Sequence, residues 1–186
     1  MPVRGLTIPS SGPAYGGPLK SNVSNLNMDA QEARAIVGRY VNEWNATKRD
    51  PMWVTLATPG DQGNVPGVTF GDQGSAHAGM ELPIRANLIV LNKAMLPGSL
   101  LSTFLHEYGH ALYRVAHSDV FDPIQSEVFA IRYSLQALET EGLQWLALDE
   151  AAAVARMASD EPYASAVAKL RDDPFWQKYA SRPSGG

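Results

Sequence analysis

The sequence predicts an α+β fold, in which a small N-terminal sheet, mixed or antiparallel, packs on one helix and precedes a mostly helical C-terminal half. Two observations carry this prediction. Residues 52–92 combine β-forming segments with turn tetrapeptides, whereas residues 99–180 show helical spacing of apolar side chains, interrupted by capping residues. The chain has 186 residues, of which 45% are hydrophobic and 18% charged. We therefore expect one domain over residues 28–180.

The two ends of the chain have a different composition from this domain. The first twenty residues contain four prolines and four glycines. Such a segment buries too little apolar surface to offset the entropy of ordering it, so we expect a disordered leader over residues 1–27. The alternative is an export leader that a secretion system reads in unfolded form. Residues 181–186 are expected to form a flexible tail.

The first half of the domain is expected to contain one helix and three or four strands. Asp29, followed three residues later by Glu32, forms a capping box that begins a helix, and the helix ends before residue 50. Segments rich in β-formers follow at Met52–Thr58, Val65–Phe70 and Leu88–Leu91. Gly-Asp-Gln-Gly tetrapeptides flank the second of these segments and indicate turns.

From residue 99 onward, capping residues divide the chain into helices. Ser99 is the expected N-cap of the first of these helices. Asp122 followed by Pro123 is expected to begin the next one, which runs to about Glu141 and stops at Gly142. The remaining helices are expected at Leu143–Ala158, Tyr163–Leu170 and Pro174–Ala180.

The histidines are the most informative residues of the chain. There are four histidines and no cysteine, which excludes disulfides, cysteine-ligated metal sites and a thiol nucleophile. His106 and His110 belong to an H-E-x-x-H motif inside a helical pattern. Residues four apart on a helix lie about 40° apart and about 6 Å along the axis, so two such imidazoles can bind one zinc ion. The alternative is a pair of helix histidines that binds no metal.

Glu107 lies between these two histidines. A carboxylate at this position is directed at a zinc-activated water, from which it takes a proton as the general base. His106, Glu107 and His110 resemble the active helix of zincin metallopeptidases. The resemblance covers about a third of the chain, and it implies a zinc cofactor, a zincin-like fold and a protein or peptide substrate.

A third metal ligand is required beside the two histidines. His117 lies about 10 Å further along a continuing helix, with no helix breaker in between, so Glu127 is the favoured candidate. Glu127 comes early in the next helix, which a short loop returns antiparallel to the first. This arrangement is similar to gluzincins, in which a glutamate on a following helix is the third ligand. His117 and Asp119 remain as alternatives, and Asp119, Asp122 or a backbone carbonyl is expected to orient a ligating histidine.

The remaining parts of a peptidase site are less well defined by the sequence. Tyr163 is the favoured hydrogen-bond donor to the oxyanion, with His77, Tyr133 and Arg132 as the other candidates. The segment from Ala86 to Asn92 is the expected edge strand for an extended peptide, although its apolar run also fits a buried central strand.

These observations together predict a zinc-dependent metallopeptidase. The alternative is a zincin-like binding or interaction domain without turnover. The net charge of −4 and the absence of a basic stripe argue against nucleic acid as a partner. The longest apolar run, Ala151–Ala155, is far too short to span a membrane. We expect a cytoplasmic protein, or one secreted without a Sec-type signal; an exported bacterial effector protease is one such role.

Overall fold

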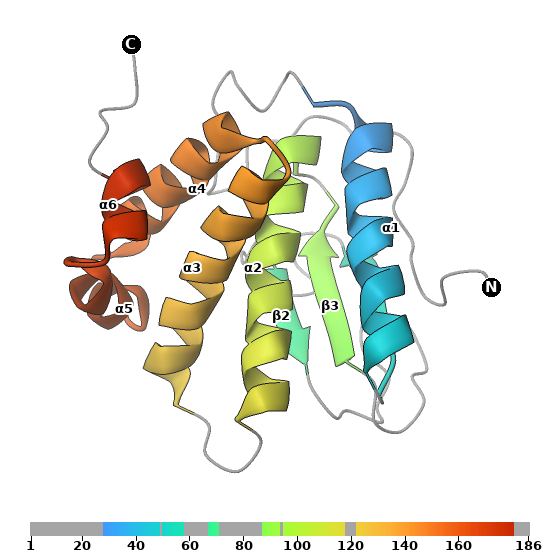
Figure 1. The fold of residues 1–186 in the computed structure, drawn as a ribbon, viewed down its shortest axis with the longest axis horizontal. Helices are drawn as coiled ribbons and strands as arrows, with labels where there is room; N and C mark the ends of the chain where they lie inside the picture. Colours follow the sequence, from blue (N-terminus) through green and yellow to red (C-terminus); the bar gives the residue numbers. More distant parts are fainter. Residues whose placement is uncertain are drawn as a thin grey trace.

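The structure is a computed structural model that describes residues 28–48, 50–57, 67–70, 87–93, 95–117 and 122–180. The predicted leader over residues 1–27 and the predicted tail over residues 181–186 lie outside the described residues. Within them, the chain is mostly helical and contains one small sheet (Figure 1). In chain order, the elements are α1 (Ala30–Thr47), β1 (Met52–Ala57), β2 (Gly67–Phe70), β3 (Asn87–Asn92), α2 (Pro97–Ala116), α3 (Pro123–Thr140), α4 (Gln144–Met157), α5 (Tyr163–Leu170) and α6 (Pro174–Ala180).

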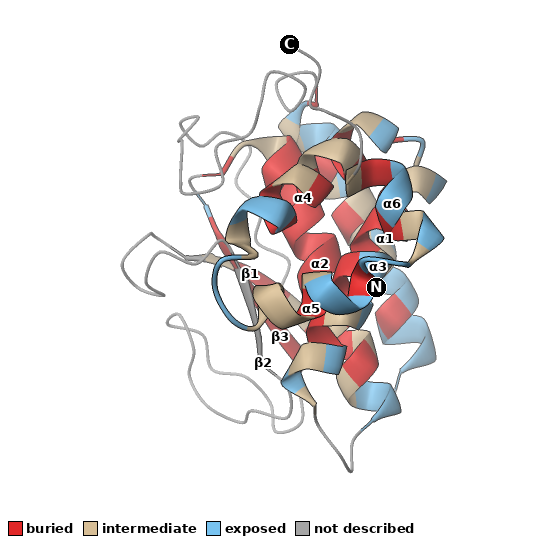
Figure 2. Cartoon of the chain, turned by 90° about the vertical axis from the view of Figure 1, so that its left-hand side faces the viewer, coloured by how far each residue is buried: buried red, intermediate tan, exposed pale blue. Residues whose placement is uncertain are grey.

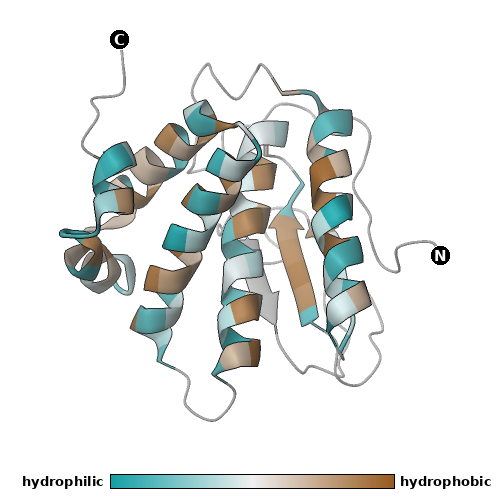
Figure 3. Ribbon diagram, viewed as in Figure 1, coloured by the Kyte–Doolittle hydropathy of each residue, from teal (hydrophilic) through white to brown (hydrophobic). Residues whose placement is uncertain are grey.

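The sheet is mixed and has the order β1-β3-β2. β1 and β3 are parallel, with Met52 opposite Asn87, and β2 is antiparallel to β3, with Gly67 opposite Leu91. All six residues of β3 are buried, and the strand stands out as hydrophobic in Figure 3. The prediction that this segment forms an edge strand for substrate is therefore wrong. Since both sides of β3 are already paired, its apolar run is that of a central strand.

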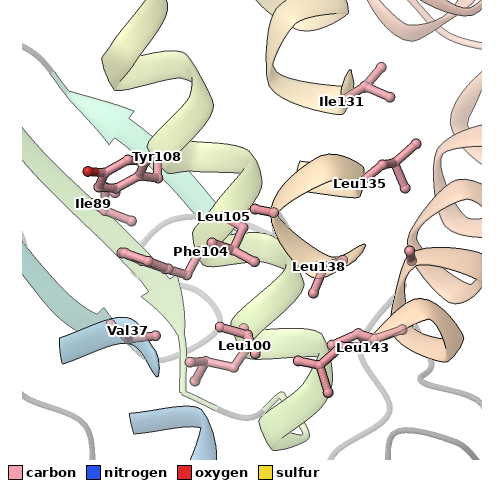
Figure 4. Close-up of a cluster of buried hydrophobic side chains, with 14 of the residues drawn as sticks. Val37, Ile89, Leu100, Phe104, Leu105, Tyr108, Ile131, Leu135, Leu138 and Leu143 are labelled. Carbon is pink, nitrogen blue, oxygen red and sulfur yellow. The ribbon is translucent and has the colours of Figure 1, made fainter. Parts of the chain in front are cut away.

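Helix α2 is the central element of the fold. It contacts α1, α3, α4, β2 and β3, and most of its residues are buried (Figure 2). Figure 4 shows Phe104 and Tyr108 on the side of α2 that faces β3, and Leu105 on the side that faces α3. All three side chains belong to one apolar cluster that extends through α1, the sheet and α4. The motif residues of α2 are thus carried by the most enclosed helix of the described chain.

Local capping signals account for most of the helix ends. The Asp29 side chain accepts a hydrogen bond from the Glu32 amide (2.7 Å), and the Asp122 side chain accepts from the two amides at the start of α3. The prediction that Ser99 caps α2 is wrong. The helix begins two residues earlier at Pro97, whose fixed φ and missing N–H suit the first helical position, so Ser99 lies buried in the first turn.

Helices α2 and α3 pack against each other at unusually short range. A Cβ atom built on Gly109 would lie 2.8 Å from the Cα atom of Ala130, which is closer than real Cβ contacts. The two backbones therefore meet at a point where α2 carries no side chain. Gly109 precedes His110, and Ala130 lies one turn after Glu127 on α3, so this contact fixes the separation of the two helices beside the candidate site.

None of the described helices combines the length and the apolar character that a membrane span requires.

Candidate metal centre

His106 and His110 project from one face of α2, one turn apart. Their rings are edge to face, with centroids 4.8 Å apart, and their Nε2 atoms lie 3.1 Å from each other. His106 is buried and His110 half-buried. The helical spacing of the motif thus directs the same ring nitrogen of both histidines at one point.

Glu127 reaches the same point from α3. Helix α3 runs antiparallel beside α2 (Figure 1), and Asp122 caps its first turn. Glu127 Oε1 lies 3.1 Å from His106 Nε2, and Glu127 Oε2 lies 3.1 Å from His110 Nε2. The structure therefore brings together the three residues that the sequence marks as metal ligands, and each histidine faces a different oxygen of the same carboxylate.

The arrangement of these atoms fits a bound metal ion. One ligand atom from each of the three residues can be chosen so that all lie within 4.8 Å of one another. Donors about 2.1 Å from a tetrahedral ion are about 3.4 Å apart, close to the observed 3.1 Å separations. Glu127 Oε1 is buried and, apart from the approach of His106 Nε2, has no hydrogen-bond partner among the described residues. A cation at the point where these lone pairs converge would satisfy them together.

The pKa values reflect this crowding of buried charges. Burial alone would lower the pKa of His106, but Glu127, and then Glu107 and Glu150, raise it to about 9. Burial would raise the pKa of Glu127, but the hydrogen bonds from His106 and His110 outweigh it and hold the pKa well below its usual range. The neighbouring carboxylates thus favour positive charge at His106, and the same charges would favour a metal cation at this point.

Glu107 and Tyr163 lie beside the three candidate ligands. The Glu107 side chain is buried, and its charge acts on both His106 and Tyr163. The Tyr163 ring, at the start of α5, stacks on the His106 ring with centroids 6.3 Å apart. Burial and the charges of Glu127, Glu107 and Glu150 raise the pKa of Tyr163 far above its usual range. The Tyr163 hydroxyl is therefore a protonated donor at neutral pH, and Glu127 is among the groups it faces.

Two polar residues at the site were not foreseen from the sequence. Ser126 Oγ lies 2.8 Å from His110 Nδ1, and Glu150 Oε1, from α4, lies 3.8 Å from His106 Nδ1. Asp122, one of three groups considered for orienting a histidine, caps α3, as its position before Pro123 predicts. A signal for Glu150 was present in the sequence: it is a carboxylate on the helix face that also carries Leu146.

The other candidate residues do not join the site, or lie outside the described residues. His117 is an exposed residue at the C-terminal end of α2, where its Nδ1–H donates to the Tyr113 carbonyl oxygen (3.0 Å). Tyr133 stacks between Tyr108 and Phe129. Arg132 has an exposed side chain that pairs with Asp173 (3.4 Å). The remaining two candidates, His77 and Asp119, are outside the described residues.

No protein-family model, curated protein or solved structure matches this chain.

Proposed function

We propose that the protein is a zinc-dependent metallopeptidase. One observation carries the proposal: His106, His110 and Glu127 direct their donor atoms at one buried point, while Glu107 lies next to the first of them in the chain. Two histidines and one glutamate are a ligand set of catalytic zinc sites, which keep a further position open for water or substrate. The resemblance of the motif helix to zincins, and of the helix-borne Glu127 to gluzincins, supports the same conclusion.

In this proposal, His106, His110 and Glu127 hold the ion. When bound, the ion polarises the scissile carbonyl and activates a water molecule for attack. Burial of these three side chains would raise the metal affinity, because few water molecules compete with the ligands. Glu107 is next to His106 in the chain, so its side chain is rotated by about 100° around the helix from that of His106. This position would place Glu107 near the ion but not among its ligands.

Proton transfer and charge stabilisation are then the tasks of Glu107 and Tyr163. The Glu107 carboxylate accepts a proton from the attacking water and returns it to the departing amine nitrogen. The Tyr163 hydroxyl donates a hydrogen bond to the oxygen on which negative charge develops. The stacking of Tyr163 on His106 supports this role, because it holds the phenol next to a ligand of the ion.

The substrate is proposed to be a protein or peptide. An exported effector that cleaves one target protein, and a cytoplasmic peptidase, are both compatible with this chemistry. The alternative of a zincin-like binding domain without turnover predicts that Glu107 can be replaced without loss of function.

The decisive experiment compares the zinc-loaded wild-type protein with Glu107→Gln. Each is incubated with a peptide library prepared from a whole proteome, and new N-termini are identified by mass spectrometry. We expect cleavage by the wild type, and a loss of at least about 100-fold in Glu107→Gln, with zinc content unchanged. Glu43→Gln, a substitution of an exposed glutamate on α1, is the matched control and should cleave like the wild type. A wild type that binds zinc but cleaves no library peptide would support the binding domain instead.

A further inference from the structure

Glu150 is a buried carboxylate on an otherwise apolar helix face. It lies on α4 and is 8% exposed, and the same helix buries Leu146, Ala147, Ala151 and Val154. Burying a carboxylate costs free energy unless a partner compensates for the lost hydration. A compensating group is therefore expected within reach of Glu150.

That group is Nδ1 of the His106 ring, the nitrogen that does not face Glu127. Glu150 Oε1 lies 3.8 Å from His106 Nδ1, within ion-pair range although longer than a hydrogen bond. His106 Nδ1 is buried and has no hydrogen-bond partner among the described residues. Ser102, one turn before His106 on α2, lies beside Glu150 and favours its charged form, while the Ser102 hydroxyl donates to the Ser99 carbonyl oxygen (3.2 Å).

His110 shows the same arrangement with a different partner. Its Nε2 faces Glu127, and its Nδ1 lies 2.8 Å from Ser126 Oγ. When Nε2 of a histidine binds a metal ion, the ring proton resides on Nδ1 and needs an acceptor. Ser126 can fill this role for His110, whereas the carboxylate of Glu150 is the described group placed to fill it for His106.

We propose that Glu150 is a positioning residue that accepts the Nδ1 proton of His106 and thereby directs Nε2 at the metal ion. The proposal rests on the metal centre of the proposed function, and it adds a fourth residue, from a third helix, to the set that determines metal affinity. A carboxylate in this position fixes the ring tautomer and orientation and makes the imidazole a stronger ligand. Helix α4 thus contributes to metal binding without supplying a ligand.

The test uses the full chain and measures zinc affinity by competition with a chromogenic chelator. Glu150→Gln keeps the size of the side chain and removes its charge, and we expect it to weaken zinc binding by about 10- to 100-fold. Asp149→Asn makes the same change of charge at the adjacent position of α4, where the neighbouring charges are Arg156 and Glu150. This control should bind zinc within about threefold of the wild type.

A second measurement begins with the wild type, so its first part does not depend on a variant folding correctly. In the zinc-loaded wild type, a long-range ¹H–¹⁵N spectrum of the histidine rings should show the His106 proton on Nδ1. In Glu150→Gln, this proton should exchange faster with water. A merely structural role of Glu150 would lower thermal stability and leave this proton signal unchanged.

The outcomes separate this inference from the proposed function. A wild type that binds one zinc, combined with Glu150→Gln of equal affinity or with a His106 proton on Nε2, would overturn the inference and leave the proposed metal centre intact. A wild type that binds no zinc would overturn both.

Discussion

The Nε2 atoms of His106 and His110 lie 3.1 Å apart, and each faces a different oxygen of the same carboxylate. Two neutral imidazoles that both carry their proton on Nδ1 would place two Nε2 lone pairs against each other and against an anion. A proton relieves this conflict in part, because it converts His106 into a cation. A metal ion relieves it completely, because one charge attracts all the donors at once.

Substitution of the third candidate ligand should therefore remove the metal. We expect the wild type to bind one zinc per chain, and both Glu127→Ala and His106→Ala to bind less than about a tenth as much after dialysis, because two protein ligands hold zinc poorly. His117→Ala is the matched control and should keep its zinc, since this exposed side chain donates to its own helix. Elemental analysis of the purified proteins measures the result. Zinc retained in Glu127→Ala and lost in His117→Ala would reverse the assignment.

The stability of the metal-free protein should depend on pH through His106. The neighbouring carboxylates raise its pKa from 6.5 to about 9 in the folded state. Protonated His106 therefore stabilises the fold fully below pH 6.5, and this stabilisation, about 1–3 kcal/mol, is lost as the pH rises through 9. Thermal unfolding of the metal-free wild type and His106→Gln should show a difference in Tm that shrinks from pH 6 to pH 9.5. A difference that grows over this range would contradict the ion pair.

Removal of the Tyr163 hydroxyl should affect catalysis and leave metal binding unchanged. Tyr163→Phe keeps the ring that stacks on His106. We expect kcat to fall by about 10- to 1,000-fold with little change in KM, because a donor to the developing oxyanion acts in the transition state. Tyr133→Phe is the control, since that ring packs against Tyr108 and Phe129 instead. Equal kcat values for the wild type and Tyr163→Phe would exclude Tyr163 as the donor.

A side chain at position 109 should disturb both the fold and the site. Gly109→Ala would force α2 and α3 apart, because its Cβ would lie 2.8 Å from the Ala130 backbone. We expect a loss of about 1–3 kcal/mol of stability, together with weaker zinc binding. Gly142→Ala offers a comparison: this glycine has φ +76° and open space around it. It should cost about 1 kcal/mol without affecting zinc affinity, and denaturant unfolding combined with zinc titration measures both effects.

The helix ends show which parts of the fold are determined by local sequence. Helices α5 and α6 have the predicted bounds, and Asp29 and Asp122 cap the helices that they were expected to begin. Capping residues and prolines act over a few residues, so they predict helix ends without information about the rest of the chain. The strand segments were also recognised, but the order β1-β3-β2 was not predicted, because strand pairing depends on contacts distant in sequence.

The same distinction applies to the candidate site. The spacing of His106 and His110 follows from helix geometry, and the proximity of Glu127 follows from two helices joined by a short connection. Glu150 is different, because its distance from His106 depends on how α4 crosses α2. No local sequence pattern predicts how α4 packs across α2. The sequence places a carboxylate one turn after Leu146 on the apolar face of α4, but only the three-dimensional structure shows which group it faces.

The close packing of Gly109 on Ala130 has a consequence for the choice of metal. Since the backbones of α2 and α3 are already in contact, the gap between His110 and Glu127 cannot shrink, and it widens only if core contacts are lost. Calcium, with oxygen distances of about 2.3–2.6 Å and six to eight ligands, would require the helices to separate. Small ions that accept few ligands need no such movement. In the proposed metal centre, size selectivity would thus be determined by Gly109, a residue that has no side chain.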